Sequence, residues 1–252
     1  NEPYSRFFID FDGVYMNSDV YLNGHLLGHR PYGYISFEYD MTPYIKRGGD
    51  NVIAVRVDNR DQPNSRWYSG CGIYRHVYLV KTQNVRVAHW GTYISCNKVS
   101  ETDAIVNIKV ELVTNESKAV KTSVSNSLMD ASGKVLERKD TTVMVAPSPS
   151  RTPLCQQMSV SRPILWSIDN PYLYKVLTVV RQGNRIVDTY TTQIGVRTFK
   201  FDPDYGFFLN GKNMKINGVC DHHDLGCLGA AINEDALHRQ LVLLKNMGCN
   251  AI

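Results

Sequence analysis

The sequence predicts a mainly β protein in which two β-sandwiches precede the first β, α and β elements of a barrel. Three observations predict this fold class. Short runs of alternating apolar and polar residues fill about the first 200 residues. The alternation restarts near Gln83, which indicates a second sandwich. After Thr198 the pattern becomes strand, loop, helix and strand, as in a βαβ unit. We therefore expect domains over 1–82, 83–197 and 198–252.

The first domain contains a strong hairpin signal. Within 20–28, the dipeptide Asn23-Gly24 stands between apolar runs, and both residues tolerate the positive φ angles that a two-residue turn requires. Three further runs have the composition of strands: 34–39, 51–58 and 76–80. Several short strands separated by glycine-containing turns are typical of a β-sandwich.

The second domain repeats this pattern over a longer stretch. Alternation predicts half-buried strands over 104–113, 120–128 and 174–180. The stretch of roughly 110 residues has the size of one immunoglobulin-like sandwich. Prolines at 147, 149 and 153 predict a loop or a sheet edge, because proline cannot donate to a ladder.

The third domain begins with a hairpin around Asn210-Gly211 and continues into a buried strand at 217–220. Asn233 is expected to cap a helix, and Gly248 is expected to end it. Apolar residues recur along this helix at helical spacing: Leu237, Leu241, Leu244 and Met247. A βαβ unit buries its strands only within a larger parallel sheet, so we expect this part to pack loosely.

Composition excludes several classes of function. The 252 residues carry a net charge of +4, from 28 Lys and Arg against 24 Asp and Glu, without a basic block, so we expect no nucleic-acid partner. No apolar run of 18 or more residues is present, so we expect no membrane span. The six cysteines form no CxxC pair, which argues against a zinc site, and we expect free thiols rather than three disulfides. We expect no metal and no cofactor.

Four stretches together resemble glycoside hydrolase family 2, and most closely its β-galactosidases. They are spread over nearly the whole chain: FDGVY at 11–15 with VYLNGHLLG at 20–28; NSRWYSGCGIYR at 64–75; LWSIDNPYLY at 165–174 with GVRTF at 195–199; and FLNGK at 208–212 with GVCDHHD at 218–224. The resemblance implies a jelly-roll sugar-binding domain, an immunoglobulin-like sandwich and a TIM barrel, in that order. This order matches the three predicted domains.

The resemblance also implies a retaining glycosidase with two glutamates about 5 Å apart on later barrel strands. Neither glutamate has a counterpart here. We expect that opening strands of the jelly roll precede Asn1 and that most of the barrel follows Ile252, so no catalytic residue lies in this chain and the chain alone is inactive. The Asn-Glu pairs at 115–116 and 233–234 are read as a sandwich turn and a helix cap.

The candidate substrate-binding residues lie in two places. His222 follows the first barrel strand and matches a family histidine that lines the galactose subsite, and His223 and Asp224 share its loop. The alternative is that these residues satisfy loop backbone. In the jelly roll, Arg66 stands where several relatives carry an active-site aspartate, and Asp58 is an alternative carboxylate for that role or a plain turn residue.

Two aromatic residues have competing interpretations. Trp67 is either a platform for a sugar ring or part of a core. Trp166 is expected in the core of the second sandwich, because buried aromatic area dominates such cores.

Three functions compete on this basis. The first is a fragment of a retaining exo-glycosidase that hydrolyses terminal β-D-galactosides, so the expected partner is a carbohydrate substrate. The second is a fragment of a family 2 β-glucuronidase or β-mannosidase. The third is a non-catalytic carbohydrate-binding module, which the start of a barrel argues against. The parent is expected to be a homo-oligomer and to be periplasmic or extracellular, with the cytoplasm as the alternative.

Overall fold

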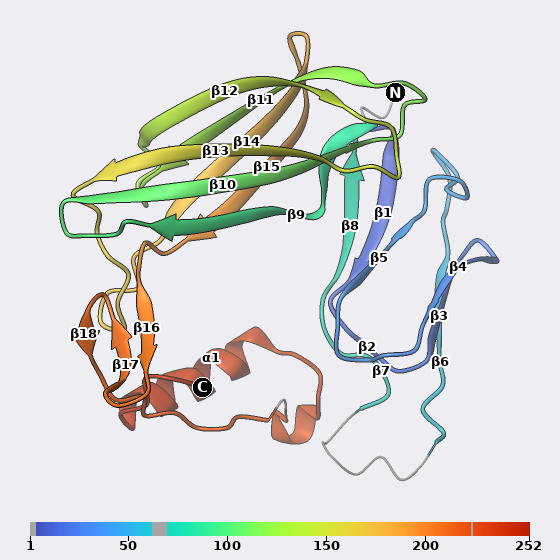
Figure 1. The fold of residues 1–252 in the computed structure, drawn as a ribbon. Helices are drawn as coiled ribbons and strands as arrows, with labels where there is room; N and C mark the ends of the chain where they lie inside the picture. The colour runs from blue at the N-terminus through green and yellow to red at the C-terminus, as the bar shows by residue number, and fades with distance from the viewer. Residues whose placement is uncertain (1–3, 62–69, 223) are drawn as a thin grey trace. The chain divides into compact units, whose positions relative to one another are not determined.

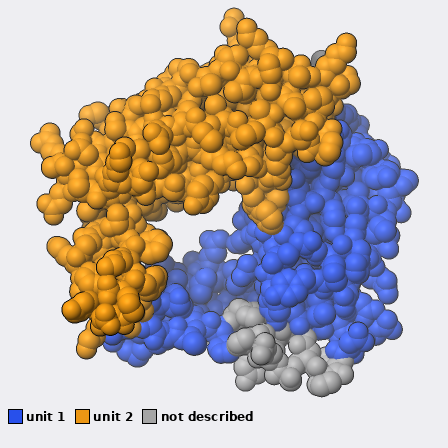
Figure 2. All heavy atoms as spheres, viewed as in Figure 1, with its two compact units in different colours: residues 1–81, 217–252 blue, residues 82–216 orange. Residues whose placement is uncertain are grey.

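The computed structural model describes residues 4–61, 70–222 and 224–252 (Figure 1). The chain is mainly β, and two sandwiches are followed by a segment that contains one helix and whose ends make a single parallel bridge, which confirms the predicted fold class. It divides into two compact units, residues 1–81 with 217–252 and residues 82–216 (Figure 2). The hairpin after Thr198 thus belongs to the second unit, while the segment from Asn217 belongs to the first.

The first unit contains two three-stranded antiparallel sheets and a short two-stranded one. Their orders are β5-β1-β8, β4-β3-β6 and β2-β7. The strands are β1 Arg6–Phe11, β2 Val14–Tyr15, β3 Ser18–Leu22, β4 His25–Arg30, β5 Phe37–Asp40, β6 Ile53–Val57, β7 Gly72–Ile73 and β8 Val77–Thr82. Phe11 of β1, Leu22 of β3 and Phe37 of β5 are buried in one core, so apolar side chains of both larger sheets meet. The hairpin predicted at Asn23-Gly24 joins β3 to β4 with φ angles of 51° and 87°, which confirms the signal.

The second unit is a seven-stranded sandwich followed by a hairpin. Its sheets have the orders β13-β10-β9 and β12-β11-β14-β15. The strands are β9 Val85–Asn97, β10 Asp103–Thr114, β11 Val120–Met129, β12 Val135–Val145, β13 Thr152–Ser161, β14 Tyr174–Gln182 and β15 Arg185–Ile194. Inward-facing residues of β10 alternate with partly exposed ones, and Val106, Val110 and Leu112 are fully buried. Pro153 lies in the edge strand β13, as the proline rule predicts.

A buried polar network lies inside this second sandwich. The Asn126 side chain donates to Gln156 Oε1 over 3.0 Å and accepts from the Thr178 hydroxyl over 2.6 Å, and Gln156 also donates to the Thr141 hydroxyl over 2.8 Å. Asn126 and Thr178 lie on β11 and β14, whereas Gln156 lies on β13 of the other sheet. The network therefore fixes the register of one sheet on the other, since misplacing it would leave buried amides unpaired.

Asp188 of β15 makes a second link between the two sheets. One carboxylate oxygen accepts from the Val87 N–H over 2.8 Å and the other from the Thr189 N–H over 2.9 Å. Val87 lies on β9 of the opposite sheet. Burial raises the pKa of the Asp188 carboxyl above its ordinary value, and the two N–H donors offset this only in part.

The hairpin β16 Phe199–Asp202, β17 Gly206–Leu209 and β18 Lys212–Asn213 ends the second unit. Its turn has Asn210 at φ 50° and Gly211 at φ 76°, which confirms the second Asn-Gly prediction.

The predicted buried strand at 217–220 is largely wrong. Gly218 and Ala251 make a parallel bridge, so the two segments run as a βαβ unit requires, but Gly218 and Cys220 are exposed. A strand of a parallel sheet is buried because other strands pair with both of its edges and helices cover both of its faces. The single bridge between Gly218 and Ala251 supplies a neighbour on one edge alone.

The helix α1 Glu234–Asn246 follows the short 3₁₀ turn η1 Gly226–Leu228. Its cap is as predicted: the Asn233 side chain accepts from the Ala236 N–H over 2.9 Å. Gly248, at φ 99°, follows the helix end. No α1 side chain is fully buried, and Leu243 and Met247 are 53% and 68% exposed. In the described part of the chain, no helix has the length and apolar character needed to cross a bilayer.

Contacts among the described residues attach this C-terminal segment to the region of β7 and β8 in the first unit. The Ile232 N–H donates to the Tyr74 carbonyl over 2.9 Å, just after β7. The His76 imidazole lies 2.9 Å from the Glu234 carboxylate at the start of α1. The segment is thus held at its middle, where the chain enters the helix.

The raised pKa of Asp188 predicts a specific dependence of stability on pH. The folded state binds this proton more tightly than the unfolded state, so the stabilisation is complete below the unfolded pKa of about 4 and is lost as pH rises through the folded pKa. We expect the free energy of unfolding of the wild type, minus that of the non-titrating Asp188→Asn variant, to fall as the pH of urea titrations is raised above about 4.

Asp130→Asn is the matched control with the opposite sign. Hydrogen bonds from Ser132 hold the pKa of Asp130 below its usual value, so that contribution is present above the unfolded pKa and is lost as pH falls. For Asp130 the free energy of unfolding of the wild type minus that of the variant should rise with pH. The same rise for Asp188 would contradict the raised pKa assigned to its carboxyl group.

Candidate functional site

A pocket of about 560 Å³ lies in the first unit, between the connection of β4 to β5 and the segment after the Gly218 bridge. We call residues 31–36 the aromatic loop and residues 219–222 the histidine segment. The aromatic loop contributes Tyr32 and Tyr34. The described residues that line it are Tyr32, Tyr34, Val219, Cys220, Asp221, His222 and Ile252. The pocket therefore brings His222, the first of the predicted sugar contacts, beside two aromatic side chains that the sequence interpretation did not single out.

Packing behind the pocket holds the aromatic loop. The Tyr34 ring meets the Tyr15 ring edge-on, with centroids 5.2 Å apart, and the Tyr32 ring meets Tyr34 in the same way at 5.6 Å. Gly33 lies so close to Tyr15 that an added Cβ would come within 2.5 Å of its ring, so only glycine fits there. The Tyr74 hydroxyl donates to the Gly33 carbonyl over 2.8 Å. The two rings are therefore positioned before any ligand arrives.

Of the predicted loop residues after His222, the structure describes Asp224. The Asp224 N–H donates to the His222 carbonyl over 2.7 Å, and the Asp224 carboxylate accepts from the Gly226 N–H over 3.0 Å. Gly226 has φ 66°, in the left-handed region that glycine tolerates. Asp224 thus closes a turn and is not among the described residues that line the pocket. His223 lies outside the described residues.

Of the two candidates from the sandwich, the structure describes only Asp58, which is not among the described residues that line the pocket. Asp58, just after β6, is paired with the Arg60 guanidinium over 2.8 and 2.6 Å, and Arg56 lies 3.5 Å away. The hydrogen bond from Arg60 holds the pKa of the Asp58 carboxyl below its ordinary value. The backbone carbonyl of Asp58 accepts a hydrogen bond from the Asn17 side chain over 3.1 Å. Arg66 and Trp67 lie outside the described residues.

Trp166 is not a core residue, contrary to the prediction. It is half-buried, and the Arg197 guanidinium lies over its ring at 4.3 Å from the centroid. An added Cβ at Gly195 would come within 2.8 Å of the Trp166 ring, so the indole covers this glycine. Trp166 therefore packs outside the buried core of the second sandwich, which mostly aliphatic side chains and Tyr174 fill.

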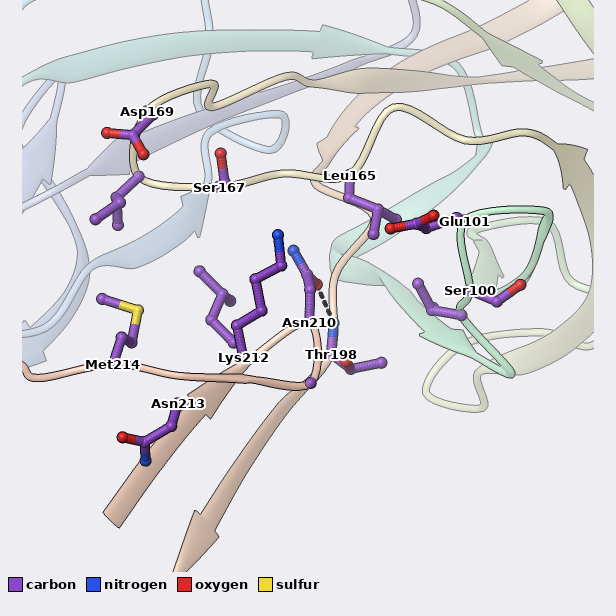
Figure 3. Close-up of a pocket in the computed structure, with 14 residues that line it drawn as sticks. Ser100, Glu101, Leu165, Ser167, Asp169, Thr198, Asn210, Lys212, Asn213 and Met214 are labelled. Carbon is purple, nitrogen blue, oxygen red and sulfur yellow. Dashed lines mark hydrogen bonds between the residues drawn. The ribbon is translucent and has the colours of Figure 1, made fainter. Parts of the chain in front are cut away.

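A second cavity, of about 680 Å³, lies in the second unit (Figure 3). It is lined by residues 99–101, 167–169 and 209–214, together with Leu165 and Thr198. Asn210 forms its inner wall: its side chain accepts from the Thr198 N–H and donates to the Trp166 carbonyl, each over 3.0 Å. In the close-up the Lys212 side chain extends between those of Asp169 and Glu101. The amide of Asn210 thus holds the hairpin on the sandwich and is not available to a ligand.

Potential metal ligands and thiols add no further centre. Among the residues that the structure describes, no group of three or more His, Cys, Asp or Glu side chains could hold a metal ion. The six cysteines are free thiols, and Cys220, in the pocket wall, is exposed.

Two β-sandwiches in tandem, followed by a helical segment whose ends make one parallel bridge, define a multidomain, mainly β protein. Comparison with family models specifies the class. The model for the sugar binding domain of glycosyl hydrolases family 2 matches residues 4–83, and the model for glycosyl hydrolases family 2 matches residues 85–197. The chain belongs to glycoside hydrolase family 2.

Curated relatives extend the similarity over nearly the whole chain. Beta-galactosidase BoGH2A of Bacteroides ovatus is 53% identical over 247 residues, which are 98% of this chain and 29% of the relative. A putative beta-glucuronidase of Formosa agariphila is 42% identical over 245 residues, 97% of this chain and 23% of the relative. This chain therefore spans less than a third of the length of either relative.

Solved structures give the same family. A glycosyl hydrolase family 2 member from Bacteroides cellulosilyticus superposes with a TM-score of 0.93 at 37% identity, over 98% of this chain and 34% of that one. A beta-glucuronidase from Bacteroides uniformis superposes with a TM-score of 0.87 at 28% identity, over 97% of this chain and 30% of that one.

The two bonds of Asn210 predict a measurable loss of stability on their removal. Asn210→Gly keeps the left-handed turn but removes both side-chain hydrogen bonds, so we expect the free energy of unfolding to fall by about 1–3 kcal/mol in urea denaturation. Asn210→Asp keeps the acceptor for Thr198 and loses the donor to Trp166, so it should show an intermediate loss. Equal stability of Asn210→Gly and the wild type would show that the hairpin is held by other contacts.

Proposed function

We propose that this chain is the sugar-recognising part of a retaining exo-glycosidase that releases terminal β-D-galactosyl units. The observation that carries the proposal is the pocket that places His222 beside Tyr32 and Tyr34. Support comes from the family and from the 53% identity to a relative named as a beta-galactosidase.

The pocket lining favours a neutral sugar over a uronic acid. A glucuronide carries a carboxylate, which an arginine or lysine side chain would recognise. Among the described residues that line the pocket there is neither, and Asp221 would repel an anionic sugar. A galactoside presents hydroxyl groups instead. An imidazole such as that of His222 can donate to a hydroxyl from one nitrogen and accept from another hydroxyl at the other.

A β-glucuronide remains the second candidate substrate. The relatives named as beta-glucuronidases, one of them 42% identical, favour it. The test below therefore compares the two sugars directly.

The described pocket residues serve binding and orientation in this proposal. Glycoside hydrolysis with retention needs two carboxyl groups about 5 Å apart, one as nucleophile and one as acid and base. No glutamate lines the pocket within the described ranges. We infer that both come from a part of the longer protein beyond these residues. His222 would hold the terminal sugar while that pair acts at its anomeric carbon.

The activity prediction uses the longer protein that carries this chain. We expect it to hydrolyse 4-nitrophenyl β-D-galactoside with a kcat/KM at least about tenfold above that for 4-nitrophenyl β-D-glucuronide, a difference of about 1.4 kcal/mol in transition-state binding. The 252 residues alone should hydrolyse neither. A preference for the glucuronide would replace the galactoside assignment, and hydrolysis of neither by the longer protein would refute the proposed function.

His222 gives the residue-level prediction. We expect His222→Ala to lower kcat/KM for the galactoside by roughly ten- to a hundredfold, because a hydrogen-bonding group to the sugar is removed from the transition state. His25→Ala is the matched control, since His25 is exposed, stacks on Tyr44 at 4.5 Å between ring centroids and does not line the pocket. Equal losses in the two variants would indicate a general effect on folding.

A further inference from the structure

The aromatic loop presents a rigid surface that is not part of the apolar core of the first unit. The Tyr32 ring is 56% exposed, although the edge-to-face contact with Tyr34 fixes it. The apolar core of the unit is made by other residues, among them Phe7, Phe11 and Phe37. Holding an exposed aromatic ring in one orientation lowers the entropy lost when a ligand stacks on it.

The walls of the pocket differ in chemistry. The histidine segment supplies the polar side chains of Asp221 and His222, which suit hydroxyl groups. The aromatic loop supplies ring faces, which suit a flat apolar surface. A ligand that fills the pocket should therefore have a hydroxylated end and a flat apolar end.

A glycoside has this division between its two parts. In an exo-acting enzyme the terminal sugar occupies the inner subsite, and the aglycone extends from its anomeric carbon toward the neighbouring wall. With the sugar at His222, the neighbouring wall in this pocket is the aromatic loop.

We propose that Tyr32 and Tyr34 form the leaving-group subsite and that Tyr32 stacks on the flat apolar face of the aglycone. The inference rests on the proposed function, because it takes the sugar to lie at His222. It adds a specificity determinant: the enzyme should prefer glycosides whose leaving group is flat, and Tyr34 should act by positioning Tyr32.

The backbone supports this assignment of roles. Gly33 separates the two tyrosines and cannot carry a side chain without a clash with Tyr15, and the Tyr74 hydroxyl holds its carbonyl. The loop is therefore fixed from behind, on the side away from the pocket. Truncation of Tyr32 should remove a contact surface without opening a cavity, since the ring is mostly exposed.

The experiment compares two galactosides that differ in the flatness of the leaving group. Benzyl and cyclohexylmethyl β-D-galactoside release alcohols of similar acidity and size, but only the first has a planar ring. We expect Tyr32→Leu in the longer protein to lower the ratio of kcat/KM for benzyl over cyclohexylmethyl galactoside by about two- to tenfold, the range of an aromatic contact. Tyr32→Phe should keep the ratio. Tyr93→Leu, at a 68% exposed position on β9, should also leave it unchanged.

The outcomes separate this inference from the proposed function. An unchanged ratio in Tyr32→Leu, or an equal loss for both substrates, would overturn the leaving-group subsite while leaving galactoside hydrolysis standing. If the wild type hydrolyses neither galactoside, the proposed function fails. The inference is then tested by the binding of benzyl β-D-galactoside to the 252-residue chain. Ligand-observed NMR with benzyl β-D-galactoside should show saturation transfer to the phenyl protons in the wild type and in Tyr32→Phe. Its absence in the wild type, or its persistence in Tyr32→Leu, would overturn the inference.

Discussion

The geometry of the pocket depends on Tyr74, because this buried residue joins separate segments of the first unit. Its hydroxyl holds the carbonyl of Gly33 in the aromatic loop, and its own carbonyl accepts from Ile232, ahead of α1. Its ring fills the space above Gly13, where an added Cβ would lie within 2.6 Å of it. The aromatic loop and the segment that carries the histidine are therefore positioned through one side chain and its backbone, and burial strengthens these hydrogen bonds.

Features whose cause is local in the chain were predictable. Both Asn-Gly dipeptides form the tight turns expected of them, since their φ angles depend on the two residues themselves. The cap at Asn233 forms for the same reason, because its partner is the N–H of Ala236. The alternation in β10 likewise reports which face of a strand is buried, and it does so without information about the partner strands.

Features that depend on distant partners were not predictable. Trp166 has the composition of a core residue, but Gly195 and Arg197 decide that it packs outside the buried core of the sandwich. Whether 217–220 is a buried strand depends on the neighbours that pair with it. The importance of Tyr32 and Tyr34 was also hidden among 15 tyrosines, because the chain carries no local mark of a ring that faces a pocket. The one available signal was the glycine between them.

The link from Asp188 to Val87 has a consequence for how the second sandwich forms. The two residues are 101 positions apart, and β15 is the last of the seven sandwich strands to leave the ribosome. Until then β14, the strand next to β11, has an unpaired edge, and the partly buried Asp188 carboxyl group that links the two sheets is missing. Because contacts of such long sequence separation form slowly, the nascent domain passes through a period in which a strand edge is open to other chains. Synthesis speed over 174–194 thus bears on how much of the protein reaches its folded state.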